Sequence, residues 1–304
     1  MAPSAPSVAS LPRRSAEGAE AGGEAFLDRA RYGLYPPGST FKLVTASAAL
    51  RQHVDPRKTT FTCARLPDGR VGAKIAGWNR PVRDDVLDAH PHGTIDVHGG
   101  FVHSCNAYFA QLAVKLGSQP LIDTANRLGI SLTPAADVAA RVRQTLPQIG
   151  YGQGDVVVTP LRMARVSAAV AANGVLRDTA VAVGSCRRSS VAACEQDEAA
   201  STATDRFLNG DDARVLAGYM RDVVLSGTGR VLRNHPGRIA GKTGTAQLDG
   251  RPSHGWFVGF APFGPAARRI AFAVVIENAG YGGGSAAPAA GEIVDAASRA
   301  GLLK

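Results

Sequence analysis

Three β-rich segments lie close together near the C-terminal end of the chain, after a long region with mainly helical patterns. They run from Arg238 to Gln247, from Gly255 to Phe260 and from Arg269 to Glu277, and turn residues separate them. The last two segments predict a hairpin whose turn lies around residues 262–267. Because one more helical pattern follows, the chain is expected to form an α+β sandwich.

Helical periodicity, N-caps and glycine stops predict six helices. Thr159 followed by Pro160 indicates one start, because threonine caps helices and proline suits the first helical position. The predicted helices run from Ser39 toward His53, from Ala107 to Leu116, from Pro120 to Leu128, from Pro160 to Val170, from Asp211 to Leu225 and from Gly291 to Ala300.

The length of 304 residues, with 45% hydrophobic and 19% charged residues, suits one large folded domain. Residues 1–24 are rich in Ala, Ser, Gly, Pro and Glu and are expected to be flexible, so the domain is expected to span residues 25–304. Lys and Arg total 34 against 25 Asp and Glu, which gives a net charge of +9. The basic residues form no run of five and no stripe with aromatic residues, so nucleic-acid binding is not expected.

Targeting and cysteine patterns give little further signal. The first residues lack the basic and apolar regions of a secretory signal, and no stretch reaches the ~18 apolar residues of a membrane span. Cys63, Cys105, Cys186 and Cys194 show no CxxC spacing and no clustered histidines, so a zinc site is not expected. Cys105 is interpreted as a packing residue, and whether Cys186 and Cys194 form a disulfide in an oxidising compartment stays open.

Ser39 and Lys42 form an S-x-x-K motif at the start of a predicted helix. A spacing of three places the serine hydroxyl and the lysine amine on one helix face, within contact distance. The positive end of the helix favours negative charge on the serine oxygen and a lowered lysine pKa. A neutral lysine can then take the serine proton, so this pair is a candidate nucleophile and base.

Ser104 and Asn106 precede a second predicted helix and can point into a cleft together from a turn. A hydroxyl there can carry a proton, and an amide can hold a substrate amide. A simple helix cap is the alternative interpretation.

A third motif, Lys242-Thr243-Gly244-Thr245, lies on a predicted strand. Alternation sends Lys242 and Gly244 to one face and the two threonines to the other, and a twist or bulge at Gly244 would bring both hydroxyls to a cleft edge. The preceding Gly237 is one residue too close for a phosphate-binding loop, and no helix follows, so nucleotide binding is not expected.

The three motifs, in this order, are the set found in serine penicillin-binding proteins and related β-lactamases. The sequence resembles the transpeptidase domain of penicillin-binding proteins, most closely the class B enzymes of cell elongation or division. The resemblance extends over nearly the whole chain from about residue 25 onward. The segment of residues 8–12 is similar to a remnant of the family's first strand. The stretches that carry it are residues 32–43, 104–109, 150–164 and 254–262.

The resemblance implies a role for each motif residue that would take part in the chemistry. Ser39 would be the nucleophile that attacks the carbonyl between two terminal D-alanines of a peptidoglycan stem peptide. Lys42 would be the base that activates it. Ser104 and Lys242 would relay the proton to the departing D-alanine.

The remaining motif residues would bind the substrate. Asn106 would hold the substrate amide, Thr243 and Thr245 would bind the terminal carboxylate, and Gly244 would let the substrate backbone approach closely. The backbone N–H groups of Ser39 and Thr245 would form the oxyanion hole. β-Lactams would acylate Ser39 because they mimic the D-Ala-D-Ala end.

The family also implies a fold, partners and a location. The fold would be an antiparallel sheet flanked by helices with an all-helical subdomain, as in β-lactamases and D,D-peptidases. The chain would work without a metal or cofactor on the extracytoplasmic, periplasmic side of the inner membrane, beside a membrane glycosyltransferase. The family's anchor and pedestal are expected to lie outside the sequence given, either truncated or truly absent. A D,D-carboxypeptidase or β-lactamase-like hydrolase, and a non-catalytic penicillin-sensing domain, remain open alternatives.

Overall fold

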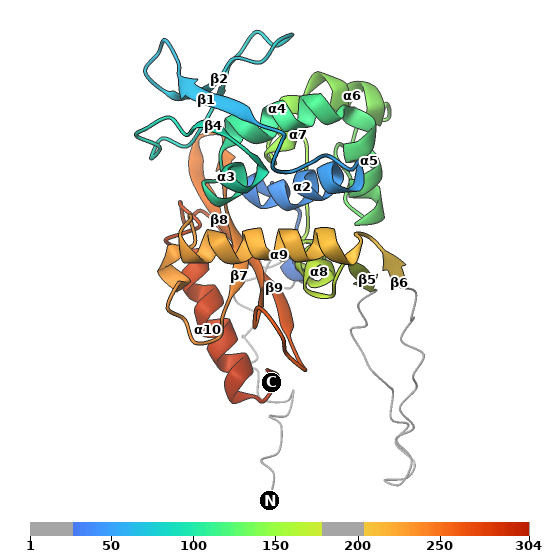
Figure 1. Ribbon diagram of the computed structural model, residues 1–304, viewed down its shortest axis with the longest axis vertical. Coiled ribbons are helices and arrows are strands. Elements are labelled where there is room, and N and C mark those ends of the chain that lie inside the picture. The colour runs from blue at the N-terminus through green and yellow to red at the C-terminus, as the bar shows by residue number, and fades with distance from the viewer. Residues whose placement is uncertain (1–26, 178–203, 304) are drawn as a thin grey trace, which may run out of the picture.

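The computed structural model describes residues 27–177 and 204–303. A three-stranded antiparallel sheet forms its centre, with strand order β7 (Ala240–Leu248), β8 (Arg251–Ala261) and β9 (Ile270–Ile276). The expected hairpin is confirmed, because β8 and β9 pair antiparallel across the turn that joins them (Figure 1). Cys186 and Cys194, whose pairing the sequence left open, and the strand-like residues 8–12 lie outside the described residues.

Alternation along β8 separates the two faces of this sheet. Trp256 and Val258 point into a large core that also contains Met163 of α8 (Pro160–Ala171) and residues of α9 (Gly210–Leu225). Phe257 points the other way, into a smaller core completed by α10 (Ala286–Arg299). The sheet is therefore covered by helices on both faces, which confirms the α+β sandwich.

A helical subdomain packs beside this sandwich and surrounds α2 (Lys42–Arg51). Every residue of α2 from Lys42 to Leu50 is buried, so this helix is buried all round rather than amphipathic. The other helices of the subdomain are α4 (Asn106–Leu116), α5 (Ser118–Arg127), α6 (Val138–Gln144) and α7 (Leu146–Gly150). The helices α4 and α5 pack against α2, as does α9 from the sandwich, and α6 packs against α5 and α7.

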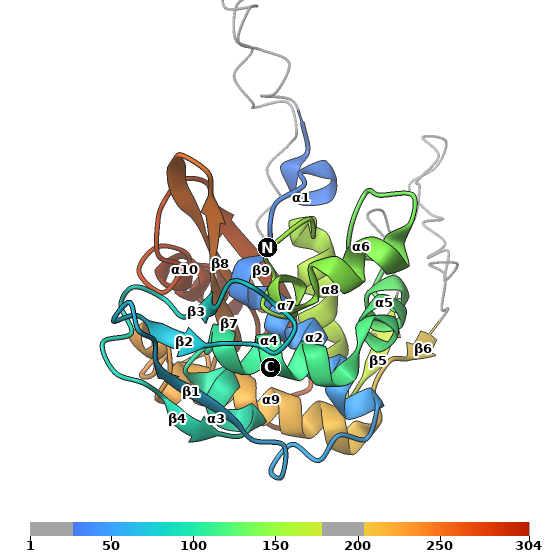
Figure 2. The same ribbon diagram turned by 90° about the horizontal axis from the view of Figure 1, so that it is seen from above.

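A small sheet with strand order β3-β2-β1-β4 lies beside α4 (Figure 2). The sequence patterns did not predict it, because its strands of two to five residues are too short to show alternation. Its strands are β1 (Phe61–Arg65), β2 (Val71–Ala73), β3 (Val82–Arg83) and β4 (Gly93–Ile95). The other short elements are α1 (Arg29–Tyr32), η3 (Gly38–Phe41), α3 (Val97–Val102), β5 (Val175–Arg177), β6 (Thr204–Arg206) and η4 (Arg230–Leu232).

The predicted helices from Ala107, Pro120, Pro160 and Asp211 all form, with ends within a few residues of those expected. The last helix begins at Ala286 rather than at the predicted Gly291. Pro288 lies in its first turn, where a missing N–H costs nothing, so it does not delay the helix start. In the described part of the chain, no helix combines the length and apolar character that crossing a membrane requires.

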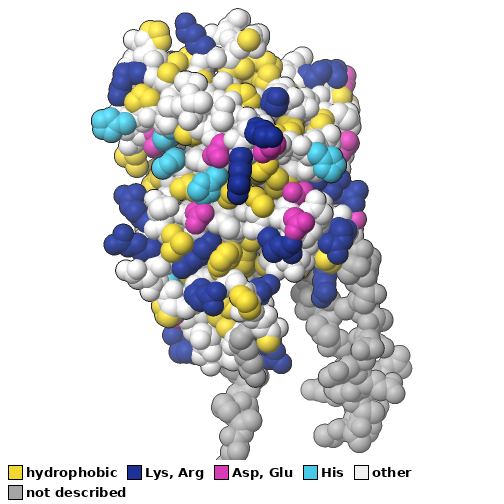
Figure 3. All heavy atoms as spheres, viewed as in Figure 1, with side chains coloured by type: hydrophobic (Ala, Val, Ile, Leu, Met, Phe, Trp, Pro, Cys, Tyr) yellow, Lys and Arg dark blue, Asp and Glu magenta, His cyan; other side chains and the backbone are white. Residues whose placement is uncertain are grey.

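Lys and Arg side chains are spread over the face seen in Figure 3, with Asp and Glu side chains between them. This scatter gives no continuous basic surface on that face, in agreement with the absence of basic runs in the sequence.

The α8 cap provides a test of the fold. The Thr159 hydroxyl accepts a hydrogen bond from the Arg162 N–H at 3.2 Å, at the start of a helix that packs against the sheet. We expect Thr159→Ala to lower the free energy of unfolding by about 1 kcal/mol, measured by denaturant titration. Thr159→Ser keeps the oxygen and is the control, and equal losses for both variants would contradict the cap.

Candidate active site

Ser39 lies in the 3₁₀ turn η3, which leads directly into α2, rather than in the first turn of the predicted α-helix. Gly38 before it has a positive φ of 51°, and its N–H donates to the Gly152 carbonyl at 3.0 Å. A Cβ at Gly38 would lie 2.6 Å from the Thr245 carbonyl oxygen. Only glycine fits here, and it holds the Ser39 turn against the edge of β7.

Lys42 is completely buried, and its amine is surrounded by oxygen atoms. The Nζ donates to Ser39 Oγ at 2.9 Å, to Asn106 Oδ1 at 2.7 Å and to Ser104 Oγ at 3.2 Å, and it also contacts the Ser104 carbonyl. Burial lowers the pKa of Lys42 to about 8, although the negative charge of Asp84 opposes the shift. A substantial fraction of this amine is therefore neutral near pH 8.

Ser104 lies between two lysines in a turn with a positive φ of 59°, immediately before α4. A non-glycine residue in this region is strained, and such strain concentrates at functional sites. Lys242 is buried, and its Nζ donates to Ser104 Oγ at 2.8 Å and to the Thr243 carbonyl at 3.0 Å. Burial and the nearby charge of Lys42 hold the pKa of Lys242 well below its usual range.

Thr243 and Thr245 line the cleft from β7, on the opposite strand face from Lys242 and Gly244 as alternation predicts. The suggested bulge at Gly244 is wrong, because the register shifts farther along the strand, between Ala246 and Leu248. A Cβ at Gly244 would lie 2.8 Å from the Thr40 methyl carbon. The glycine therefore lets the strand approach the turn that carries Ser39.

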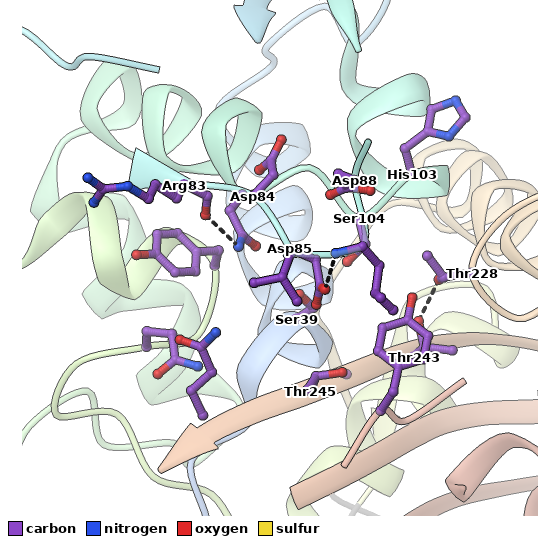
Figure 4. Close-up of a pocket in the computed structure, with 18 of the residues that line it drawn as sticks. Ser39, Arg83, Asp84, Asp85, Asp88, His103, Ser104, Thr228, Thr243 and Thr245 are labelled. Carbon is purple, nitrogen blue, oxygen red and sulfur yellow. Dashed lines mark hydrogen bonds between the residues drawn. The ribbon is translucent and has the colours of Figure 1, made fainter. Parts of the chain in front are cut away.

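These groups meet in one cavity of about 340 Å³ (Figure 4). Ser39, Ser104, Thr243 and Thr245 all lie along it, and Thr228 enters from the loop after α9, with its hydroxyl 2.5 Å from the Thr243 hydroxyl. Its lining also includes Arg70, Asp84, Asp85, Asp88, Asn106, Tyr151, Gln153, Gln247 and Tyr281. A serine oxygen, two buried amines and several hydroxyl groups in one cleft can support nucleophilic acyl transfer.

A second group of polar side chains lies buried directly behind Ser104. Asp84 Oδ2 accepts hydrogen bonds from the thiols of Cys63 at 3.0 Å and Cys105 at 3.1 Å, and lies 3.2 Å from His92 Nδ1. The four side chains offer ligand atoms that all lie within 4.8 Å of one another. Two thiols, an imidazole and a carboxylate are ligands that Zn²⁺ accepts, so these residues could hold a metal ion, which the cysteine spacing did not predict.

Hydrogen bonding fixes the charges of this group, which we call the Asp84 cluster (Cys63, Asp84, His92 and Cys105). The hydrogen bond to Asp84 raises the pKa of His92 to about 10. Burial alone would raise the pKa of Asp84, but hydrogen bonds from His92 and Cys63 lower it to about 2. Asp84 Oδ1 also accepts the Ala107 N–H at 2.9 Å, so the charged pair anchors the first turn of α4.

The eight motif residues predicted from the sequence therefore converge on one cleft, whereas His254 does not line it. His254 packs edge-on against Tyr35 and accepts the Asn278 N–H at 3.0 Å. The stretch from Arg80 to His92 contains none of the three sequence motifs, yet it supplies the buried Asp84 and also Asp85 and Asp88, and all three line the cleft. An aspartate-rich stretch beside a predicted cleft was the available signal.

An acyl-transfer cleft of this kind, built on a helix-covered antiparallel sheet, defines the class of serine enzymes in which lysine serves as the base. The family comparison is more specific. Residues 7–295 match the model of the penicillin binding protein transpeptidase domain, and the chain belongs to this family.

Similarity to individual proteins agrees with this assignment. The chain is 29% identical to the peptidoglycan D,D-transpeptidase PbpA of Mycolicibacterium smegmatis over 90% of its own length and 57% of that protein. It superposes with a TM-score of 0.69 on penicillin-binding protein A of M. tuberculosis, solved as a cephalosporin acyl-enzyme complex, at 26% identity and covering 89% and 62% of the two chains. A D,D-transpeptidase domain from Eggerthella lenta gives a TM-score of 0.73, at 26% identity and covering 91% and 68%. The chain spans about half the length of the curated relatives it matches.

Gly38 provides a test of the turn that carries Ser39. We expect Gly38→Ala to slow covalent labelling by a fluorescent penicillin at least tenfold, because the new methyl group would push the turn away from Thr245. The control is Gly69→Ala, which also has a positive φ but has open space around it. Equal labelling rates for the two variants would show that the close approach does not matter.

The Asp84 cluster provides a second test. Asp84→Asn removes the negative charge and leaves His92 and the two thiols without their shared acceptor. We expect the free energy of unfolding to fall by about 3 kcal/mol, measured by denaturant titration. Asp68→Asn, which breaks a surface ion pair with Arg83, should cost far less because solvent screens exposed charges. A comparable loss in both variants would contradict a buried charge network.

Proposed function

We propose that this chain is the transpeptidase domain of a class B penicillin-binding protein, spanning residues 25–304, that crosslinks peptidoglycan stem peptides. The observation that carries the proposal is the contact of Lys42 Nζ with Ser39 Oγ at 2.9 Å inside a buried site shared with a second lysine. The relatives named as peptidoglycan D,D-transpeptidases support it.

Acylation would begin at Ser39. Neutral Lys42 takes the hydroxyl proton while the oxygen attacks the carbonyl carbon between the two terminal D-alanines. The backbone N–H groups of Ser39 and Thr245 stabilise the negative charge that develops on the carbonyl oxygen. Asn106 accepts from Lys42 Nζ at 2.7 Å and keeps that amine in place. Its Nδ2 donates one N–H to the Arg83 carbonyl at 3.1 Å and has a second N–H for the substrate backbone.

Departure of D-alanine would use Ser104, Lys242 and the threonines of β7. The leaving nitrogen needs a proton, and Ser104 Oγ can pass one because it accepts hydrogen bonds from both Lys42 and Lys242. Thr243 and Thr245 hold the terminal carboxylate at the edge of β7, beside the Lys242 amine, and Gly244 leaves room for the substrate backbone.

An amine from a neighbouring stem peptide then attacks the acyl-enzyme and forms the crosslink. β-Lactams acylate Ser39 in the same way but present no such departing group. The domain works on the extracytoplasmic, periplasmic side of the inner membrane, where its substrate lies, with a membrane glycosyltransferase as partner. A related structure of a peptidoglycan synthase complex that coordinates polymerization and crosslinking supports such a partner.

The direct test is the intact mass of the protein after incubation with penicillin. We expect one stable penicilloyl adduct that maps to the peptide containing Ser39 and disappears in Ser39→Ala. Ser131→Ala, which alters an exposed serine away from the cleft, should retain the adduct. Rapid turnover of the drug would favour the hydrolase alternative, and an adduct in Ser39→Ala would show that the nucleophile is misassigned.

The lowered pKa of Lys42 predicts how acylation depends on pH. The neutral amine is the reactive form, so the penicillin acylation rate should rise as the pH increases through about 8 and then level off. Asp84→Asn removes a negative charge that raises this pKa, so its profile should shift to lower pH. Stopped-flow acylation between pH 6 and 9.5 measures both, and a profile flat across this range would contradict the role of Lys42.

A further inference from the structure

Two buried thiols of the Asp84 cluster have no part in the acyl transfer. Cys63 on β1 and Cys105 before α4 are both free cysteines, and neither side chain is open to solvent. Both thiols donate to the same atom, Asp84 Oδ2, at 3.0 and 3.1 Å, and their sulfur atoms lie within 4.8 Å of each other. One acceptor therefore holds two thiols from separate elements side by side, where they can react with each other.

A cavity beside the Ser39 cleft offers the thiols a route to small molecules. This cavity of about 440 Å³ is lined by His92, among other residues, and His92 Nδ1 lies 3.6 Å from Cys63 Sγ. Cys63 pairs with Gly93 of β4, a strand of only three residues. Short strands with few backbone hydrogen bonds open locally at low cost. A small reactant therefore reaches Cys63 from this cavity when His92 and β4 move aside.

Cys105 connects the thiol pair to the groups that contact Lys42. It is the residue between Ser104 and Asn106, whose oxygen atoms accept hydrogen bonds from Lys42 Nζ at 3.2 and 2.7 Å. Its Sγ also accepts the Tyr108 N–H at 3.2 Å and caps α4. Since Ser104 already has a strained positive φ, a bond that pulls Cys105 Sγ toward β1 would alter both contacts with Lys42.

We propose that Cys63 and Cys105 form a redox-sensitive site, in which a small disulfide oxidant converts the two thiols into a disulfide that distorts the Ser104 turn and slows acylation of Ser39. Disulfides form and persist in oxidising compartments, and the proposed location of the domain is outside the cytoplasm. The effect on acylation rests on the proposed function, whereas formation of the bond does not.

The electrons and protons of this reaction balance with the oxidant as the only co-reactant. The Cys63 sulfur loses its proton and attacks one sulfur of the oxidant, whose S–S bond breaks, and half of the oxidant leaves as a thiol. The Cys105 sulfur then loses its proton and attacks Cys63 Sγ, so that the other half leaves as a second thiol. Two electrons pass from the pair to the oxidant. Asp84 loses both thiol donors but keeps His92 and the Ala107 N–H.

The first test detects the bond itself. The full chain is treated with a chelator, which removes any metal ion that would occupy the same thiols, and then with hydroxyethyl disulfide. Remaining thiols are blocked with iodoacetamide, and the digested protein is analysed by mass spectrometry. We expect the peptide that contains Cys63 to be joined to the peptide that contains Cys105, and a phosphine reductant should separate them. Two alkylated peptides after complete oxidant treatment would overturn the site.

The second test measures what the bond does. We expect the oxidised chain to react with a fluorescent penicillin about tenfold more slowly than the reduced chain, because displaced groups lose their alignment with the reacting atoms. Reduction should restore the rate. Hydrogen exchange in residues 104–109 should be faster after oxidation, since the Tyr108 N–H loses its sulfur acceptor. A complete disulfide with an unchanged labelling rate would overturn the effect on acylation.

Matched variants assign the effect to this pair of thiols. Cys63→Ser keeps a donor for Asp84 but cannot form the bond, so its labelling rate should be the same before and after oxidant treatment. The control replaces both Cys186 and Cys194, which lie outside the described residues, by serine and should keep the tenfold loss. A loss that persists in Cys63→Ser, or that disappears in the control, would overturn the assignment.

The same measurements distinguish failure of this inference from failure of the proposed function. A reduced wild-type chain that does not react with penicillin would contradict the proposed function. The joined peptides and the hydrogen exchange of residues 104–109 would still decide whether the thiols bond and move the Ser104 turn. Normal labelling of the reduced chain without a joined peptide overturns only the redox site.

Discussion

The buried amine of Lys42 is the constraint on which the rest of the site depends. An ammonium group removed from water is costly unless hydrogen bonds replace its hydration. The chain supplies them from two places that are far apart in sequence, the Ser39 turn and the segment from Ser104 to Asn106 at the start of α4. Satisfying one buried group thus requires the sandwich and the helical subdomain to meet at a single point, where the cleft opens.

The pKa of Lys42 is set by two opposing effects, burial and the negative charge of a neighbouring carboxylate. Burial lowers the pKa of Lys42, while the negative Asp84 raises it. Burial and the charge of Lys42 together lower the pKa of Lys242. His92 keeps Asp84 ionised by pairing with it. The cluster behind Ser104 therefore has two effects at once, because it anchors the first turn of α4 and tunes the amine beside Ser39.

The sequence predicted the parts of the site that local geometry determines. Ser39 and Lys42 are three residues apart, so their contact follows from one helical turn, and the order of helices and strands indicated the sandwich. The contact of Lys242 with Ser104 spans 138 residues and was reached only through the family resemblance. The Asp84 cluster joins β1, a loop and the Ser104 turn, so neither spacing nor periodicity could predict it.

The loop from Arg80 to His92 contributes both to the buried Asp84 cluster and to the lining of the cleft. Its Asp84 and His92 side chains form the charged pair beside the turn that carries Ser104, and Asp84, Asp85 and Asp88 line the cleft. A chain with a net charge of +9 thus places carboxylates along its cleft. Because Asp84 also binds Cys105 and the first turn of α4, a change in this loop acts on the Ser104 hydroxyl that accepts hydrogen bonds from both buried lysines.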